Sequence, residues 1–335
     1  MKLGDLLKGS APQASGRSGG SFSFPTDPAE RNRWILAAIA VGLILYAYGI
    51  ALTCSANNRF MSVFRWLASY WSEGQDFAHG WVVPIVSGGV MVWKWKKKLH
   101  AVLMDTSAAG LSLVVVGLLL YWLGVRSANP RVTAVSLPIL LFGLIWYLAG
   151  WKWAKESWFA CTFLFFMIPL NFLDPIIAFP LRLFVTKFAV IFLNVFGMEV
   201  QQVGTAIHSL KNRFEPLDVA DPCSGIRSLI ALMALTSIYG YVTMNKWWKK
   251  WVLFLSCIPL AVIGNLARIV TIAFVAQGFG QETAMPLYHD YSGYIVFSLA
   301  ILCMIAIGTL MNLHYRELIY RWTQEEVTTP RPAAR

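Results

Sequence analysis

The chain has 335 residues, of which 57% are hydrophobic and only 13% are charged. Soluble domains carry about 25% charged residues, so this composition excludes an ordinary soluble enzyme, a secreted disulfide scaffold and a disordered regulator. The formal net charge of +11 does not gather on a soluble module, so we interpret it as the lysine and arginine excess of cytoplasmic loops in a membrane protein, and not as a nucleic-acid-binding surface.

In chain order, residues 1–33 are polar and rich in Ser and Gly, which predicts a disordered tail. The apolar runs that follow are close to the roughly 20 residues needed to cross a bilayer as a helix. They predict an all-α polytopic membrane protein, with a transmembrane domain at 34–312 and a second tail at 313–335. We expect about eight transmembrane helices, at residues 34–53, 77–93, 108–125, 132–149, 157–173, 225–243, 252–275 and 289–312.

The distribution of lysine and arginine predicts the orientation. The clusters KWKKK at 94–98 and NKWWKK at 245–250 fall in loops on the same side as both tails. The side richer in these residues faces the cytoplasm, so both termini are expected there.

Residues 174–197 are apolar enough to form a further span, but a crossing there would move the lysines at 245–250 to the outer side. Pro180, Arg182 and Lys187 also interrupt the run. We therefore predict an interfacial or re-entrant helix on the outer face, with Arg182 and Lys187 extending to the lipid headgroups. The stretch 198–222 alternates in part between apolar and polar residues, which predicts a small extramembrane β-hairpin or cap there.

Cys223 is the first candidate functional residue. It lies in DPCSGIR at the expected start of a span, where the helix dipole and Arg227, one turn later, would stabilise a thiolate. Gly225 would leave room for a substrate backbone. Two other interpretations stay open: a buried structural cysteine, and a disulfide bond with Cys54, the other cysteine expected near the outer face.

Arg268 and Asn265 lie three residues apart in GNLARIV, in the outer half of the seventh expected span. An arginine within a span costs about 2.5–3.5 kcal/mol on insertion scales, so it should face a cavity or a partner. It could stabilise an oxyanion or bind a carboxylate, and Asn265 could orient the guanidinium or donate to the same oxyanion. The alternative is an arginine that simply reaches the interface.

Two histidines are expected at the same membrane depth. His289, in YHDYSGY, could act as a general base and acid beside a thiol or lie at the interface without a role. Gly293, four residues later, would let a neighbouring helix pack closely. His79, in FAHGWVVP, could bind substrate, support the site or merely lie at the interface. The remaining cysteines, Cys161, Cys257 and Cys303, fall within apolar runs and are expected to be buried.

The segments DPCSGIRSL, GNLARIV and HDYSG resemble, in this order, the Cys-Ser-Gly, Asn-x-x-Arg and His-x-x-x-Gly blocks of the exosortase/archaeosortase family, and FAHGWVVPI is similar to its N-terminal block. The resemblance covers roughly residues 60–312. It implies a membrane cysteine transpeptidase in which Cys223 is the nucleophile, Arg268 stabilises the oxyanion and His289 is the acid and base. The residues expected to bind substrate or support the site are His79, Ser224, Gly225, Arg227, Asn265 and Gly293.

The resemblance also implies the partners and the location. Members act on exported proteins with a C-terminal signal made of a short motif (Pro-Glu-Pro in bacterial substrates), a transmembrane helix and a basic tail. The site is then expected at the periplasmic face of a bacterial inner membrane, and no metal or organic cofactor is needed. Three alternatives stay open: a transporter with Arg268 and His289 in a substrate or proton path, an assembly factor that docks through residues 198–222, and a membrane acyltransferase.

Overall fold

The apolar runs fold into helices because a helix pairs its own backbone N–H and C=O groups, as a lipid environment requires. The computed structural model describes residues 28–56, 59–72, 77–102, 104–170, 172, 174–211, 213–218, 225–280 and 292–313. The α-helices in these ranges are α1 (Pro28–Ile44), α2 (Val63–Trp71), α3 (Val82–Lys97), α4 (Ala108–Arg126), α5 (Pro130–Ala149), α6 (Trp151–Phe163), α7 (Phe179–Val195), α8 (Gly225–Thr243), α9 (Trp247–Phe279) and α11 (Ser292–Asn312). Short π- or 3₁₀-helical segments are η1 (Leu45–Ile50), η2 (Ala78–Trp81), η3 (Leu99–Ala101), η4 (Leu164–Met167) and η6 (Asp174–Ala178).

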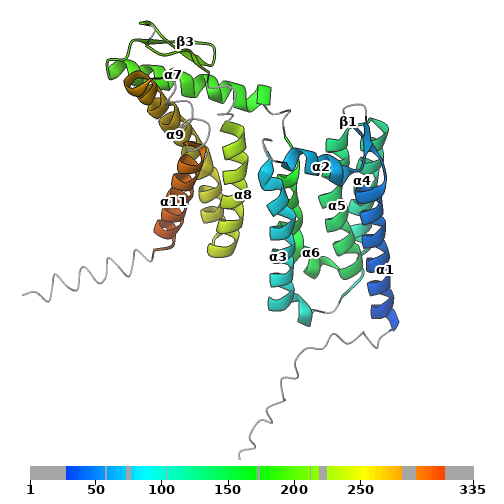
Figure 1. Cartoon of the computed structure of the whole chain (residues 1–335). Coiled ribbons are helices and arrows are strands. Elements are labelled where there is room, and N and C mark those ends of the chain that lie inside the picture. Colours follow the sequence, from blue (N-terminus) through cyan, green and yellow to red (C-terminus); the bar gives the residue numbers. More distant parts are fainter. Residues whose placement is uncertain are drawn as a thin grey trace, which may run out of the picture.

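The helices form two groups (Figure 1). The first contains α1 to α6, and the second contains α7, α8, α9 and α11 together with a small sheet. Helix α8 connects them, because Ile230 and Ala234 belong to the same buried cluster as Val83 of α3. Further along α8, Tyr241 stacks on Phe159 of α6 with ring centroids 3.8 Å apart. The chain is thus an all-α polytopic membrane protein, as predicted.

Six of the described helical stretches are long and apolar enough to cross a membrane. They are Arg31–Ile50, Ala108–Arg126, Pro130–Ala149, Pro175–Val195, Trp247–Phe279 and Gly293–Asn312. Five of them match predicted spans, although the first helix begins at Pro28, earlier than expected. The predicted spans 77–93, 157–173 and 225–243 correspond to the shorter helices α3, α6 and α8. The count of eight therefore depends on these three helices and on the position of α7.

Helix α7 lies across the ends of α8 and α9 instead of running alongside them (Figure 1), and it packs against α9. This crosswise arrangement is the one expected of an interfacial helix. Lys187 is exposed. Arg182, however, is only 8% exposed, so the expectation that it extends to the headgroups is wrong. The reason is its place on the buried face of α7, which it shares with Val185 and Ala189.

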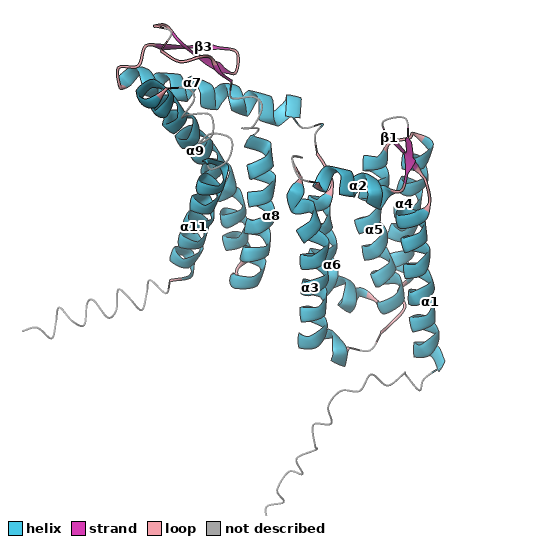
Figure 2. Cartoon of the chain, viewed as in Figure 1, coloured by secondary structure: helices cyan, strands magenta, loops and turns pink. Residues whose placement is uncertain are grey.

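The predicted hairpin is present in a three-stranded antiparallel sheet (Figure 2). Its strands are β3 (Val200–Val203), β4 (Ala206–Ser209) and β5 (Leu217–Asp218). Asn194 of α7 holds the start of β3: its side-chain amide donates to the carbonyl of Val200 and accepts from the N–H of Val200, both at 3.0 Å. Ile207 of β4 is fully buried with Leu193 of α7, so the sheet covers one end of the helices. A second, two-stranded sheet, β1 (Cys54–Ala56) and β2 (Arg59–Met61), follows the first helix and was not predicted.

Helices α4 and α5 pack closely because three glycines recur every seven residues along α4. A Cβ at Gly110 would lie 2.3 Å from the backbone nitrogen of Tyr147, and one at Gly124 would lie 2.5 Å from that of Thr133. At Gly117 the corresponding distance to a backbone atom of α5 is 2.9 Å. Such a stripe lets two helix backbones approach each other, which is how helices associate in a membrane without a hydrophobic driving force.

We expect Gly110→Ala to destabilise the protein in detergent by about 1–3 kcal/mol, because the added methyl group overpacks the interface with α5. The control is Gly88→Ala in α3, where a Cβ would meet nothing within 4 Å and the higher helix propensity of Ala should raise stability slightly. Thermal unfolding of the two purified variants measures the difference. Equal midpoints for Gly110→Ala and Gly88→Ala would contradict this account of the α4–α5 interface.

Candidate functional site

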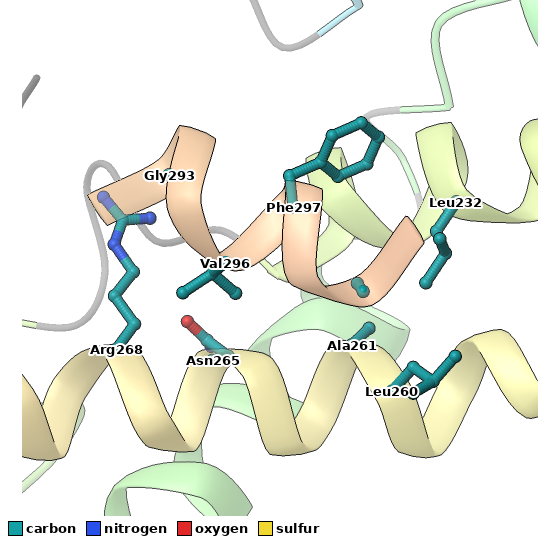
Figure 3. A pocket seen from close by; sticks show the side chains of 9 residues that line it. Leu232, Leu260, Ala261, Asn265, Arg268, Gly293, Val296 and Phe297 are labelled. Atoms are coloured by element: carbon teal, nitrogen blue, oxygen red, sulfur yellow. The ribbon is translucent and has the colours of Figure 1, made fainter. Parts of the chain in front are cut away.

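A small pocket opens where α8, α9 and α11 meet (Figure 3). Its volume is about 60 Å³, and three of its lining residues are ones that the sequence singled out: Asn265, Arg268 and Gly293. The other lining residues are apolar: Leu232, Leu260, Ala261, Val296, Phe297 and Ala300. Sequence reasoning missed these six, because an apolar residue that lines a pocket looks the same in the sequence as one that faces lipid.

The pocket forms at a close contact between α9 and α11. A Cβ at Gly264 would come within 2.7 Å of Cγ1 of Val296, so a larger residue would require Val296 to shift. Gly293 was expected to provide such a contact, but a Cβ there would meet nothing within 4 Å. That packing role is therefore wrong for Gly293, which lines the pocket at the start of α11. The close contact lies instead at Gly264, one residue before Asn265, and a glycine within an apolar helix was the signal for it.

Asn265 is 9% exposed and presents its side-chain amide to the pocket (Figure 3). Within the described ranges this amide has no hydrogen-bond partner. Of the two roles considered for Asn265, a hydrogen bond to the guanidinium of Arg268 is not seen in the described part of the chain, and donation to an oxyanion stays a prediction. The amide therefore contributes no hydrogen bond to the fold within the described ranges and is accessible to a ligand from the pocket.

Arg268 lies one helical turn after Asn265, on the same face of α9. Its guanidinium extends from α9 toward the first turn of α11, beside Gly293 (Figure 3). The side chain is partly exposed and lines the pocket. A fixed positive charge is therefore positioned at one edge of a cavity that is otherwise mainly apolar, where charge interactions are stronger than in bulk water.

Some of the other predicted site residues lie within the described ranges, and some do not. The described part of α8 runs from Gly225 and includes Arg227, while the expected first turn with Cys223 lies outside the described residues. Cys223, Ser224 and His289 lie outside the described residues, so their positions and roles stay predictions.

His79 lies in η2, a tightly packed turn before α3. A Cβ at Gly80 would come within 2.0 Å of the indole of Trp71, and that indole donates a hydrogen bond to the carbonyl of Met167 at 2.9 Å. The His79 ring interacts with the backbone of Phe166, while its Nε2 is buried without a hydrogen bond. His79 does not line the pocket with Arg268, so the structure does not bring these two residues together there.

Cys54 is a free, buried thiol. The disulfide bond considered from the sequence is therefore not present, and burial raises the pKa of the Cys54 thiol, which makes it a poor nucleophile. The three cysteines expected within apolar runs are also free: Cys161 and Cys257 are buried, and Cys303 is partly exposed. In the part of the chain that the structure describes, no three His, Cys, Asp or Glu side chains gather as metal ligands would.

These features define a polytopic helical membrane protein with an arginine and an asparagine at a pocket between three helices. The family model described as "Transmembrane exosortase" matches residues 71–306. The chain belongs to the transmembrane exosortase family. No curated protein matches it in sequence, and no solved structure matches it.

We expect Gly264→Ala to destabilise the protein by about 1–3 kcal/mol, because the new methyl group meets Val296. In a Val296→Ala background the same change should be nearly neutral, which gives a coupling energy of about 0.5–3 kcal/mol between the two positions. Gly278→Ala, on the same helix but with open space around its Cβ, is the control. Thermal unfolding of the four members of the cycle tests the contact, and additive effects would show that α9 and α11 do not meet there.

Proposed function

We propose that this member of the exosortase family is a membrane cysteine transpeptidase that cleaves the C-terminal sorting signal of exported proteins. The observation that carries the proposal is the pocket with Asn265 and Arg268. It is lined by α8 and α11, and Cys223 and His289 precede the described parts of these two helices by two and three residues in the sequence. The predicted nucleophile Cys223 and the predicted acid His289 are thus close in sequence to α8 and α11, two of the three helices that line the pocket with Arg268.

The proposed reaction is an acyl transfer. The Cys223 thiolate attacks the carbonyl carbon of the scissile peptide bond, and the Arg268 guanidinium stabilises the negative oxygen of the tetrahedral intermediate. The C–N bond then breaks, His289 gives a proton to the leaving amine, and the acyl group stays on sulfur as a thioester. The cut C-terminal helix leaves with its new amino group. An acceptor amine or water next attacks the thioester, loses its proton to His289 and returns Cys223 to the thiolate.

The proposed substrates are tethered to the membrane by the helix of their own sorting signal, as in a Pro-Glu-Pro motif followed by an apolar helix and a basic tail. We place the site at the periplasmic face of the inner membrane, with both termini in the cytoplasm. Confinement of enzyme and substrate to one bilayer raises their effective concentration, which suits a site at the ends of helices. His79, with its buried and unpaired Nε2, is proposed to support the site or bind substrate from the first group of helices.

The Cys223→Ala variant should leave a co-expressed reporter with such a signal uncut, because no other group can form the thioester. Intact-mass spectrometry of the reporter measures the loss of its C-terminal helix. The matched control is Cys54→Ala, which removes a buried thiol and should process the reporter as the wild type does. A Cys223→Ala variant that cuts the reporter as fast as the wild type would contradict the assignment of Cys223 as the nucleophile.

The Arg268→Lys variant should lower the rate of processing at least 100-fold, because lysine keeps the charge but loses the planar set of donors that a developing oxyanion requires. Removal of one oxyanion donor costs about 2.7–4 kcal/mol in comparable sites. Arg213→Lys, in an exposed loop, is the control and should be unchanged. Equal rates for the two lysine variants would remove Arg268 from the mechanism.

A further inference from the structure

The pocket between α8, α9 and α11 has two chemically distinct parts (Figure 3). Its polar edge consists of Asn265 and Arg268. The remainder is formed by small or apolar residues from all three helices. The acyl transfer proposed above uses only the charge of Arg268. It leaves both the apolar part of the cavity and the amide of Asn265 without a role.

We propose that this pocket binds one small apolar side chain of the substrate, next to the bond that is cut, and that Asn265 binds the main chain of the same residue. The proposal rests on the function proposed above and adds a size limit on the substrate. It makes the pocket the part of the enzyme that determines which residue is accepted at this position.

The size of the cavity sets the limit. Its volume of about 60 Å³ is less than half that of an engineered apolar cavity of about 150 Å³ that holds a benzene molecule. A side chain of one to three carbon atoms fits such a space, and an aromatic side chain does not. Ala261, Ala300 and, from α11, Val296 belong to the apolar part of the lining. An additional methyl group on any of them would reduce the available volume.

The amide of Asn265 indicates why the occupant is a peptide. The side chain is more than nine-tenths buried, faces the pocket and has no hydrogen-bond partner in the described part of the chain. It offers both a donor and an acceptor, which match the C=O and N–H groups of a peptide main chain. A lipid acyl chain could fill the apolar part, but it has no group that could pair with this amide. The apolar part would then select the side chain, while Asn265 binds the backbone whatever the sequence.

The test uses the full-length protein co-expressed with exported reporters that end in a Pro-Glu-Pro motif, an apolar helix and an arginine tail. Each position from the motif to the first turn of the helix is replaced in turn by Gly, Ala, Val, Leu or Trp. Intact-mass spectrometry gives the fraction of each reporter that has lost its helix. With the wild type, we expect one position at which Gly, Ala and Val are accepted while Leu and Trp lower processing at least tenfold.

Substitutions of pocket-lining residues should change the largest side chain that is accepted at this position, some lowering it and others raising it. Ala261→Leu fills the pocket and should lower the ratio of Val to Gly processing at that position at least tenfold. Val296→Ala enlarges the pocket and should raise the ratio of Leu to Val processing, a gain that misfolding cannot produce. The controls change exposed neighbours outside the lining: Ala267→Leu on α9 and Ile295→Ala on α11. Asn265→Leu should lower processing of all reporters without changing their ratios.

Three results would overturn the proposal. The first is a wild type that accepts Trp as well as Ala at every position. The second is a set of ratios that Ala261→Leu and Val296→Ala leave unchanged, or that the controls shift equally. The third is a wild type that leaves every reporter intact, as Cys223→Ala does. That last result would overturn the proposed function together with the subsite, whereas the first two concern the subsite alone.

Discussion

The close approach of α9 and α11 at Gly264 is the contact on which the candidate site depends. It brings the first turn of α11 to the part of α9 that carries Asn265 and Arg268, and the space left beside it is the pocket. A second glycine, Gly308, fits α11 against Tyr239 of α8 in the same way. Small residues thus determine where three helices meet, as is typical of helix packing in membranes.

Polar groups inside this protein are few, and most of them are used by the fold. Ser87 donates to the carbonyl of Ala160, and Tyr48 pairs with Ser136. The amide of Asn265 has no hydrogen-bond partner in the described part of the chain and faces the pocket. A polar group at an apolar cavity is therefore free to bind a ligand, and its place beside Arg268 is a stronger sign of function than either residue alone.

Much of the fold could be predicted from the sequence, because apolar run length and lysine distribution report directly on membrane insertion. The helices and the hairpin after α7 followed from such local signals. The burial of Arg182 and the two-stranded sheet around Cys54 could not, because they depend on contacts between distant segments. For the site, Asn265 and Arg268 stood out as polar residues in an apolar run, whereas the apolar lining had no distinguishing signal. Cys223 and His289 remain predictions.

Helix α9 has 33 residues and is therefore about 50 Å long, well beyond the roughly 30 Å of a hydrocarbon core. Lys250 and Arg268 are separated along it by about 27 Å, nearly one membrane thickness. Pro259 lies between them and removes one backbone hydrogen bond at that point. A helix longer than the hydrocarbon core accommodates the difference by tilting or kinking, so the thickness of the bilayer bears on the orientation of the helix that carries Arg268.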